Sequence, residues 1–338
     1  MRFEDRYSRQ VLFPAIGGEG QKKLGASSVA IVGCGATGTC VAGLLARAGV
    51  GRILIVDRDY VEPSNLQRQS LFDEADAAES LPKSIAAARK IAAFNSDVTV
   101  RAEVADLTPE NAPALLEQAD LILDATDNFE TRYLINDFAV KNGKAWIYAA
   151  AVAAYAATMN VLPGETACLT CMFPAPPEGS VATCDTAGIL NSAVNLVGAI
   201  EATEALKFLV GAREQMRRTL LSFDVWSNER AEIAANHPRA DCLTCARREF
   251  VHLNGEHHRH ITLCGRDSVQ IHERHRPVDF GEISLRLQPH GKVRHNDYVL
   301  RFWREPYELT LFPDGRAIIK GTTDTSVARS LYAKYVGS

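Results

Sequence analysis

Residues 29–69 are VAIVGCGATGTCVAGLLARAGVGRILIVDRDYVEPSNLQRQ, and this stretch predicts a strand, a glycine turn, a helix, a second strand and a polar loop. The apolar, branched run at 29–32 has the length of a buried parallel strand. A helix should follow from about residue 36, and a second strand should cover 52–56. Elements in this order predict an α/β fold with a Rossmann-like nucleotide-binding sheet.

The glycine turn has the spacing G-x-G-x-x-G, with glycines at Gly33, Gly35 and Gly38. In this pattern the first glycine permits the tight bend, the second lets a phosphate approach the backbone, and the third lets the helix pack on the strand. The helix also offers N–H groups and the positive end of its dipole to an anion. Glycine-rich turns occur as plain structural turns too, so the pattern alone does not establish a nucleotide site.

Asp57 ends the second strand, close to the offset of about 20 residues expected of the acid that binds ribose hydroxyls. The loop that follows is polar and lies past the carboxyl end of a strand, where open α/β sheets bind ligands. There, Arg68 would clamp a phosphate through its planar guanidinium, and Asn65 would hold a phosphate or ribose oxygen. An NAD-binding fold shares the glycine turn and Asp57, and a solvated loop without a ligand is a further alternative.

Composition restricts the class of protein. The chain has 338 residues, which favours two domains, and a net charge of −4, which makes a nucleic-acid partner unlikely. It contains no apolar span long enough to cross a bilayer, and its first ten residues are charged where a signal peptide would be apolar. We therefore expect a cytoplasmic protein without a membrane segment. All nine histidines lie at or beyond His237, so the chain before that point has no imidazole for acid–base chemistry.

Lys83 is the first of two further charged residues expected at the nucleotide. It lies in the first turn of a helix that should run to Phe94, with Pro82 in the same turn because the missing N–H of proline costs little there. Near a helix N-terminus the ammonium group is placed to meet an anionic ligand. The alternative is an ordinary exposed lysine.

Asp127 is the second charged residue expected at the nucleotide. A strand over 97–104 and a helix over 109–118 should lead to a buried strand from Leu121, which ends in acid at Asp127. A carboxylate at the end of a strand, opposite a phosphate site, suits Mg²⁺, which takes one or two carboxylates and phosphate oxygens. Alternatively, Asp127 would cap the helix predicted at 129–141.

Four cysteines form two identical C-L-T-C pairs, at Cys168 and Cys171 and at Cys242 and Cys245. Each pair supplies two thiolates from one tight turn, and together they complete a tetrahedral Zn²⁺ site. A closed shell of four thiolates leaves no position for water, so the metal should be structural. A redox function of the cysteines is the alternative.

Cys184 lies between the two pairs in a loop rich in proline and glycine. A long helix is expected over about 186–209, directly after this cysteine. The dipole at the N-terminus of that helix would lower the pKa of the Cys184 thiol and make it reactive.

The predicted domains are 1–246, which holds the nucleotide and zinc sites, a polar linker over 247–260, and a small α+β accessory domain over 261–338. In the accessory domain we expect strands near 261–272, 293–303 and 307–319 and helices near 279–287 and 324–335.

Several motifs in one order resemble the ThiF/MoeB/HesA adenylyltransferases, bacterial relatives of the ubiquitin-activating enzymes. They are R-Y-S-R-Q at 6–10, the glycine turn, D-R-D at 57–59, N-L-Q-R-Q at 65–69, Pro82-Lys83, A-T-D-N at 125–128 and the two cysteine pairs. The resemblance spans roughly residues 1–246. Leu81 departs from it, because the family usually has glycine before this Pro-Lys.

The resemblance implies ATP-dependent adenylylation, with Mg²⁺, of a ubiquitin-like sulfur carrier protein that ends in Gly-Gly. It also implies a homodimer in which Arg9 reaches the ATP phosphates of the partner. A thiol at Cys184, or a sulfur donor such as a cysteine desulfurase or a rhodanese, would then prepare the thiocarboxylate. The residues implied to act in catalysis are Arg9, Arg68, Lys83, Asp127 and Cys184. Those implied to bind the nucleotide are Gly33, Gly35, Gly38, Asp57, Asp59, Asn65, Arg68, Gln69, Lys83 and Asp127.

The expected reaction agrees with the absence of histidine from the chain before His237. A C-terminal carboxylate is already ionised at neutral pH, so its attack on the α-phosphate of ATP needs no general base. It needs neutralisation of crowded negative charge and an in-line pose. Two other functions stay open from the sequence: an NAD-dependent oxidoreductase and a nucleotide-binding scaffold without catalysis. A tRNA substrate is disfavoured by the acidic balance of the chain.

Overall fold

The computed structural model describes residues 6–175, 187–255, 262–263, 268–271 and 278–337. These residues form two compact units, and neither is continuous in sequence. The first unit consists of Met1–Ala78 and Lys83–His257, and the second of Glu79–Pro82 and His258–Ser338. Each unit has its own sheet and its own hydrophobic core.

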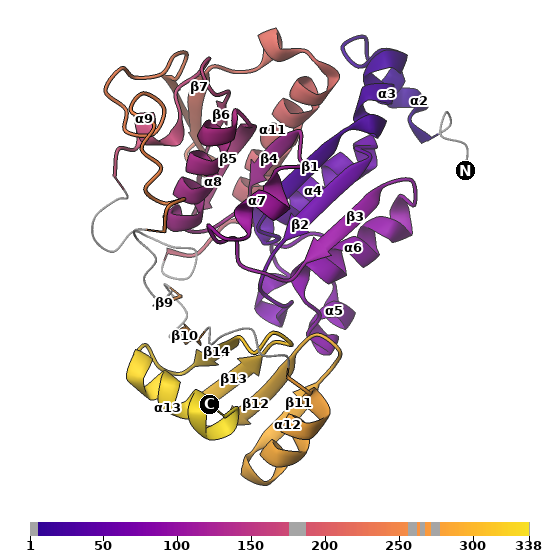
Figure 1. Cartoon of the computed structure of the whole chain (residues 1–338). Coiled ribbons are helices and arrows are strands. Elements are labelled where there is room, and N and C mark those ends of the chain that lie inside the picture. Colours follow the sequence, from indigo (N-terminus) through magenta and orange to yellow (C-terminus); the bar gives the residue numbers. More distant parts are fainter. Residues whose placement is uncertain (1–5, 176–186, 256–261, 264–267, 272–277, 338) are drawn as a thin grey trace. The chain divides into compact units, whose positions relative to one another are not determined.

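The first unit is built on an eight-stranded sheet in the order β3-β2-β1-β4-β5-β6-β7-β8 (Figure 1). The strands are β1 (Ser28–Val32), β2 (Arg52–Val56), β3 (Thr99–Glu103), β4 (Leu121–Asp124), β5 (Ala145–Val152), β6 (Tyr155–Val161), β7 (Thr219–Asp224) and β8 (Glu229–Ala234). From β3 to β5 the neighbours are parallel, and from β5 to β8 they are antiparallel. Because β1 lies between β2 and β4, the loops that follow these three strands leave the same edge of the sheet.

Helices cover both faces of this sheet. They are α2 (Ser8–Val11), α3 (Gly17–Ala26), α4 (Ala36–Ala48), α5 (Glu74–Glu79), α6 (Lys83–Phe94), α7 (Ala112–Leu116), α8 (Phe129–Asn142), α9 (Leu169–Met172) and α11 (Asn191–Val210), with short 3₁₀ turns η1 (Pro63–Asn65) and η2 (Arg213–Gln215). Along β5, Trp146 and Tyr148 join the core under α8, whereas Ala149 joins Val197 of α11. Since side chains alternate along a strand, α8 and α11 cover opposite faces.

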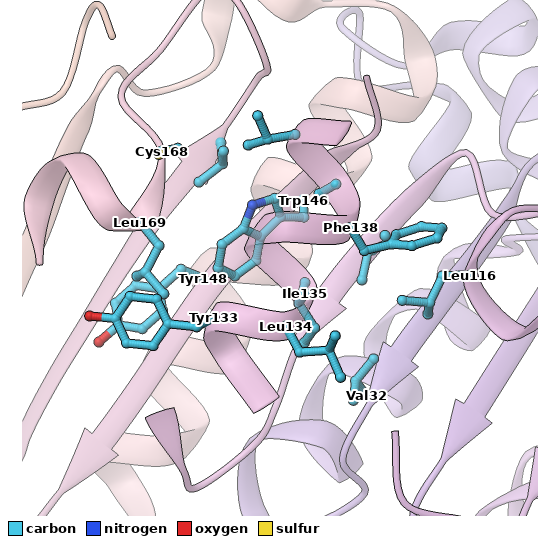
Figure 2. Packing of buried hydrophobic residues seen from close by; sticks show 14 of the residues in the cluster. Val32, Leu116, Tyr133, Leu134, Ile135, Phe138, Trp146, Tyr148, Cys168 and Leu169 are labelled. Atoms are coloured by element: carbon cyan, nitrogen blue, oxygen red, sulfur yellow. The ribbon is translucent and has the colours of Figure 1, made fainter. Parts of the chain in front are cut away.

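One hydrophobic core cluster of the first unit lies under α7 and α8. Figure 2 shows Trp146, which is fully buried, among the side chains of Phe138, Ile135 and Tyr133 from α8. Cys168 belongs to the same cluster, so the first cysteine pair is part of the core rather than an appendage on its surface. Among the residues that the structure describes, none of the helices combines the length and the apolar character needed to span a lipid bilayer.

The expectations for the first unit are largely confirmed, with three corrections. The helix expected over 109–118 is limited to α7. The long helix expected from about 186 begins only at Asn191, because Gly188 has a left-handed φ of 73° and Leu190 is extended. Pro82 precedes the first helical residue of α6 rather than lying within its first turn.

The later strands of the first unit were not anticipated from the sequence. The alanine-rich run at 149–157 forms the hairpin of β5 and β6, which turns at Ala153 with a φ of 53°. The polar stretch assigned to a linker also belongs in part to this unit. Phe250 and Leu253 pack against its core, and the ring of His252 stacks on Tyr133 at 4.8 Å.

The second unit contains the α+β domain expected near the C-terminus. Its sheet has the order β11-β12-β13-β14-β10-β9, with antiparallel neighbours. The elements are β9 (Thr262–Leu263), β10 (Ser268–Ile271), α12 (Phe280–Leu287), η3 (Gln288–His290), β11 (Lys292–His295), β12 (Leu300–Arg304), β13 (Tyr307–Leu311), β14 (Ala317–Lys320) and α13 (Thr325–Tyr335). Asp279 and Asp324 cap the two α-helices through their carboxylates, as acids at helix N-termini commonly do.

Candidate functional site

The glycine turn between β1 and α4 depends on two glycines for its shape. Gly33 has a φ of 93°, and a Cβ there would lie 2.5 Å from the carbonyl oxygen of Ala125. A Cβ on Gly38 would lie 2.2 Å from the carbonyl oxygen of Gly33. Gly35 differs, because the nearest atom to its Cβ position is Nε2 of Gln69 at 3.9 Å. Gly33 and Gly38 are therefore required by packing, while Gly35 leaves open space beside the N-terminus of α4.

Alanine substitutions should separate these two functions of glycine. Gly38→Ala is expected to lower the free energy of unfolding by about 2–3 kcal/mol, because backbone must move to admit the methyl group. Gly35→Ala should change it by no more than about 0.5 kcal/mol, but should weaken ATP binding if a phosphate approaches at this point. Urea denaturation and ATP titration of both variants provide the measurement. Equal stability of the two variants would contradict the packing argument.

Asp57, Asp59 and Lys83 connect the glycine turn to β2 and α6. Asp57 accepts hydrogen bonds from the backbone N–H groups of Cys34 at 2.6 Å and Asp59 at 2.7 Å. Nζ of Lys83 donates to the Asp59 carboxylate at 2.9 Å, and N–H of Lys83 donates to the Asp59 carbonyl at 2.8 Å. Burial raises the pKa of Asp57, and the ammonium of Lys83 opposes this shift. Asp57 thus fixes the turn, and each of its oxygens keeps a further lone pair for a ligand hydroxyl.

Arg58 brings Asp127 into the same neighbourhood. Its Nη1 donates to Asp106 at 2.7 Å, and its Nε lies 3.8 Å from Asp59. Burial lowers the pKa of Arg58, but the carboxylates of Asp106, Asp59 and Asp127 outweigh burial and raise it. Positive charge from Arg58 and Lys83 and negative charge from Asp59 and Asp127 therefore gather beside the glycine turn.

Asp127 is exposed at the end of β4, and it does not cap the next helix. The cap of α8 is Asn128, whose side-chain oxygen accepts from the backbone N–H of Thr131 at 2.8 Å. The alternative that Asp127 serves as a helix cap is therefore wrong. Its carboxylate stands in solvent beside the arginines, where a divalent cation and phosphate oxygens have access.

Arg132 holds the loop that carries Asp127. It is 5% exposed, donates from Nε to Asp124 at 3.0 Å, and donates from Nη2 to the carbonyl oxygen of Thr126. Thr126 in turn donates its hydroxyl to Asp124 at 2.6 Å. A buried arginine on α8 thus fixes the path of the chain from Asp124 to Asp127. Neither Arg58 nor Arg132 stands out from the sequence as an individual site residue.

The polar loop after Asp57 carries three candidate residues, Asn65, Arg68 and Gln69, which differ in burial and in hydrogen-bond partners. Asn65 is 2% exposed and accepts from the backbone N–H of Glu62 at 3.0 Å, so it holds the η1 turn. Arg68 donates to the carbonyl oxygen of Ser64 at 2.8 Å. Gln69 is 3% exposed, and its Oε1 accepts no hydrogen bond from any residue that the structure describes. A buried amide oxygen without a partner beside Gly35 suits a ligand donor at that position.

The four cysteines of the two C-L-T-C pairs meet in space. Their sulfur atoms all lie within 4.8 Å of one another, and successive distances are 3.7 Å for Cys168–Cys171, 3.6 Å for Cys168–Cys242 and 3.4 Å for Cys171–Cys245. Four thiolates at about 2.3 Å from one Zn²⁺ would be about 3.8 Å apart, so the arrangement fits a tetrahedral metal. The hydroxyls of Thr170 and Thr244 bond each other at 2.9 Å and join the two turns directly.

A buried carboxylate beside this cluster should make stability depend on pH. Asp137 is 1% exposed, and burial raises its pKa to about 6. Hydrogen bonds from the backbone N–H groups of His252 and Leu253 and from the hydroxyl of Thr244 oppose this rise and offset only part of it. Because the folded pKa lies above the unfolded value, the folded state loses stability as the pH rises from about 4 to above 6.

The variant Asp137→Asn lacks this titration. We expect wild type to gain about 2–3 kcal/mol of unfolding free energy relative to the variant when the pH falls from 7 to 4. Denaturation of both proteins at the two pH values measures this difference in unfolding free energy. The acid sensitivity that the thiolates of the cysteine cluster cause is common to both proteins, so it cancels in the comparison. Parallel pH profiles would show that Asp137 is not held in this way.

Two further candidates are Arg9 and Cys184. Arg9 is exposed on α2, with Leu12 at 70% and Phe13 at 59% exposure after it. Cys184 lies outside the described residues. The expectation that a helix begins directly after it concerns residues that the structure does not describe, and it stays a prediction; α11 itself starts at Asn191.

Comparison with known proteins gives a consistent result. A model of the ThiF family matches residues 7–244. The Sulfur carrier protein ThiS adenylyltransferase of Bacillus subtilis is 45% identical over 336 residues, which are 98% of this chain and 99% of that protein. The Sulfur carrier protein adenylyltransferase of Thermus thermophilus is 42% identical, over 65% of this chain and 83% of that protein.

Solved structures support the fold. A crystal structure of Escherichia coli MccB with MccA-N7isoASN superposes with a TM-score of 0.65 and covers 73% of this chain and 75% of that one. At 23% identity this likeness concerns the fold only.

Proposed function

Because the chain belongs to the ThiF family, we propose that it adenylylates the C-terminal glycine carboxylate of a ubiquitin-like sulfur carrier protein, consuming ATP and releasing pyrophosphate. The near full-length match to a sulfur carrier adenylyltransferase makes an NAD-dependent oxidoreductase or a silent scaffold the weaker reading. The carrier should end in Gly-Gly, and the protein should work in the cytoplasm.

The observation that carries this proposal is the group of charges beside the glycine turn. Lys83, Arg58 and Asp127 gather there, and the chain has no histidine before His237. Attack by an ionised carboxylate on the α-phosphate requires no proton acceptor, but requires stabilisation of the charge that develops on the phosphates and on the departing pyrophosphate. A site rich in fixed charge and without imidazole suits that chemistry.

Each candidate residue has a function in this scheme. Asp57 accepts from the ribose hydroxyls, and Gln69 offers its unpaired amide oxygen to the nucleotide. Arg68 and Lys83 bind phosphate oxygens, for which Lys83 exchanges part of its contact with Asp59. Gly35 leaves room for the phosphates at the N-terminus of α4. Asn65 acts indirectly, because it holds the η1 turn that precedes Arg68.

Asp127, exposed and held by the Arg132 network, is the residue proposed to hold Mg²⁺. The ion would neutralise phosphate charge. Cys168, Cys171, Cys242 and Cys245 are proposed to hold a structural Zn²⁺ that fixes the turn after β6 to the segment after β8.

The proposed assembly is a homodimer. Arg9 lies too exposed on its own chain to be buried in a site there, and the exposed apolar side chains of Leu12 and Phe13 directly follow it. An interface that covers these two residues would carry Arg9 to the phosphates of the second copy. In the last step, the thiol of Cys184 or a sulfur donor such as a cysteine desulfurase or rhodanese displaces AMP from the acyl-adenylate.

Carrier-dependent ATP–pyrophosphate exchange tests the function, with a panel of Gly-Gly-terminated carriers and the same carriers lacking the last glycine as controls. Exchange with at least one intact carrier and none with its truncated form is the expected result. Exchange that persists without any carrier, or fails with all of them, would contradict the proposal. Repeating the assay with Cys184→Ala separates activation, which should persist, from thiocarboxylate formation.

A further inference from the structure

The short helix α2 is fixed on both sides of Arg9, the residue that it carries. Tyr7, directly before the helix, is 3% exposed, although Arg9 is exposed two residues later. Gln10 follows Arg9, and its Nε2 donates to Oε1 of Gln21 at 2.6 Å and to the carbonyl oxygen of Ala48 at 2.8 Å. The backbone of α2 is therefore anchored, while the side chain of Arg9 lies in solvent.

Tyr7 is held at the C-terminal ends of two helices, α4 and α6. Its hydroxyl accepts a hydrogen bond from Nδ2 of Asn95 at 2.8 Å, and the same Nδ2 donates to the carbonyl oxygen of Ala46 at 2.6 Å. Ala46 lies in the last turn of α4, and Asn95 directly follows the last residue of α6. Asn95 is 1% exposed, so this junction is closed to water.

Gly49, which ends α4, makes room for the Tyr7 ring. Its φ is 85°, and a Cβ at this position would lie 2.5 Å from Cζ of the ring, so a methyl group would have to displace the ring. Gly143 ends α8 in the same left-handed conformation, with a φ of 65°, but its Cβ would meet no atom within 4 Å. Alanine at the two positions therefore shares the backbone strain, and only alanine at Gly49 displaces Tyr7.

The opposite ends of α4 and α6 lie at the glycine turn. α4 begins at Ala36 within that turn, α6 begins at Lys83, and Sγ of Cys34 lies 3.8 Å from the carbonyl oxygen of Lys83. At about 1.5 Å per residue, the two ends of each helix lie roughly 16–18 Å apart. No arginine side chain bridges such a span. Arg9 is therefore anchored at the end of these helices that faces away from the proposed phosphate site of its own chain.

We propose that Tyr7 is a positioning residue, which fixes α2 on the C-terminal ends of α4 and α6 so that Arg9 is presented to the phosphate site of a second copy of this chain. Tyr7 acts on the reaction only through α2, because it is buried at the end of the two helices away from the glycine turn. The anchoring of α2 concerns one chain alone. The use of Arg9 by a second copy rests on the proposed function.

Hydrogen exchange of the full chain without ATP tests the anchor, in Tyr7→Phe, in Gly49→Ala and in the matched control Gly143→Ala. The amides of α2 and of the turn after it, such as that of Val11, which donates to the Tyr7 carbonyl at 2.9 Å, report on the anchor. They should exchange severalfold faster in Tyr7→Phe and Gly49→Ala, because local opening becomes easier, and at the wild-type rate in Gly143→Ala. Wild-type rates in both Tyr7→Phe and Gly49→Ala would overturn the anchor.

A mixed dimer tests what the anchor does for Arg9. Gly49→Ala alone should lower ATP–pyrophosphate exchange about tenfold, because a misplaced arginine stabilises the phosphates poorly. In a dimer of one Gly49→Ala chain and one Asp127→Asn chain, purified through two different tags, the first chain supplies Asp127 and the second supplies an intact α2. One complete site then forms, so exchange should recover severalfold over either variant alone. Damage by Gly49→Ala to the site of its own chain would not be rescued in this way.

The pair of Arg9→Ala with Asp127→Asn is the reference for the mixed dimer. Rescue in this pair, but not in the pair with Gly49→Ala, would overturn the positioning by Tyr7. A loss of exchange in Gly143→Ala as large as that in Gly49→Ala would overturn it too, since backbone strain alone would then explain both. If neither pair is rescued, the dimer of the proposed function is refuted, and faster hydrogen exchange in Tyr7→Phe would still establish the anchor.

Discussion

Replacing Asp127 with asparagine is expected to lower carrier-dependent ATP–pyrophosphate exchange by a factor of about a hundred to a thousand. The carboxylate is exposed, and the helix that follows is capped by Asn128, so the substitution removes charge without removing a structural contact of comparable value. An amide has the same shape but cannot neutralise a divalent cation, and charge near the phosphates is what the proposed transition state requires. The thermal unfolding midpoint should therefore stay close to that of wild type.

Glu117→Gln is the matched control, because it also converts an exposed acid of the first unit to its amide, away from the glycine turn. Exchange should be unchanged in this variant. Raising the Mg²⁺ concentration should partly restore Asp127→Asn if the defect is metal affinity. Near wild-type exchange in Asp127→Asn at ordinary Mg²⁺ would remove this residue from the site.

The second large effect is expected at the cysteine cluster. Cys168→Ser should lower the free energy of unfolding by more than about 4 kcal/mol, a loss typical of a removed structural metal. Cys168 is 1% exposed and lies in the core cluster under α8, so a vacant site would also leave polar sulfur and hydroxyl groups without partners there. Metal analysis of purified protein should give one zinc per chain in wild type and much less in the variant.

Cys40→Ala separates metal loss from loss of a buried thiol. Cys40 is a buried cysteine on α4, and it lies outside the cluster of four. Its replacement should preserve zinc content and most of the stability. Wild-type protein that contains no zinc, or that unfolds at the same temperature with and without a strong chelator, would contradict a structural metal.

Local patterns predicted the first half of the nucleotide-binding sheet. The strands at 29–32 and 52–56, the glycine turn and the helix from 36 are specified by residues close in sequence, and the structure confirms them. The hairpin of β5 and β6 was missed because its nine residues from Ala149 to Ala157 are mostly alanine, which has little strand preference of its own. These strands form because their neighbours pair with them on both sides.

In the candidate site, too, some residues could be predicted from local sequence and others depend on the fold. Glycine spacing and strand-end acids in the sequence predict Gly33, Asp57 and Asp127 as site residues, whereas Arg58 and Arg132 were not singled out. The residues that neighbour an arginine in the sequence do not indicate whether its side chain will be buried. Arg58 pairs with Asp106, 48 residues away, and Arg132 donates both to Asp124 on the preceding strand and to the carbonyl oxygen of Ala149 on the neighbouring strand β5.

The separation of the two cysteine pairs has a consequence for biosynthesis. Seventy residues lie between Cys171 and Cys242, and they include α11, β7 and β8. At about 5–20 residues per second the ribosome needs on the order of ten seconds to make them. During that interval the nascent chain carries two thiols of a metal site whose other half does not yet exist. Capture of the proposed zinc would therefore be a late event of translation, and oxidants that reach the early pair in those seconds would compete with it directly.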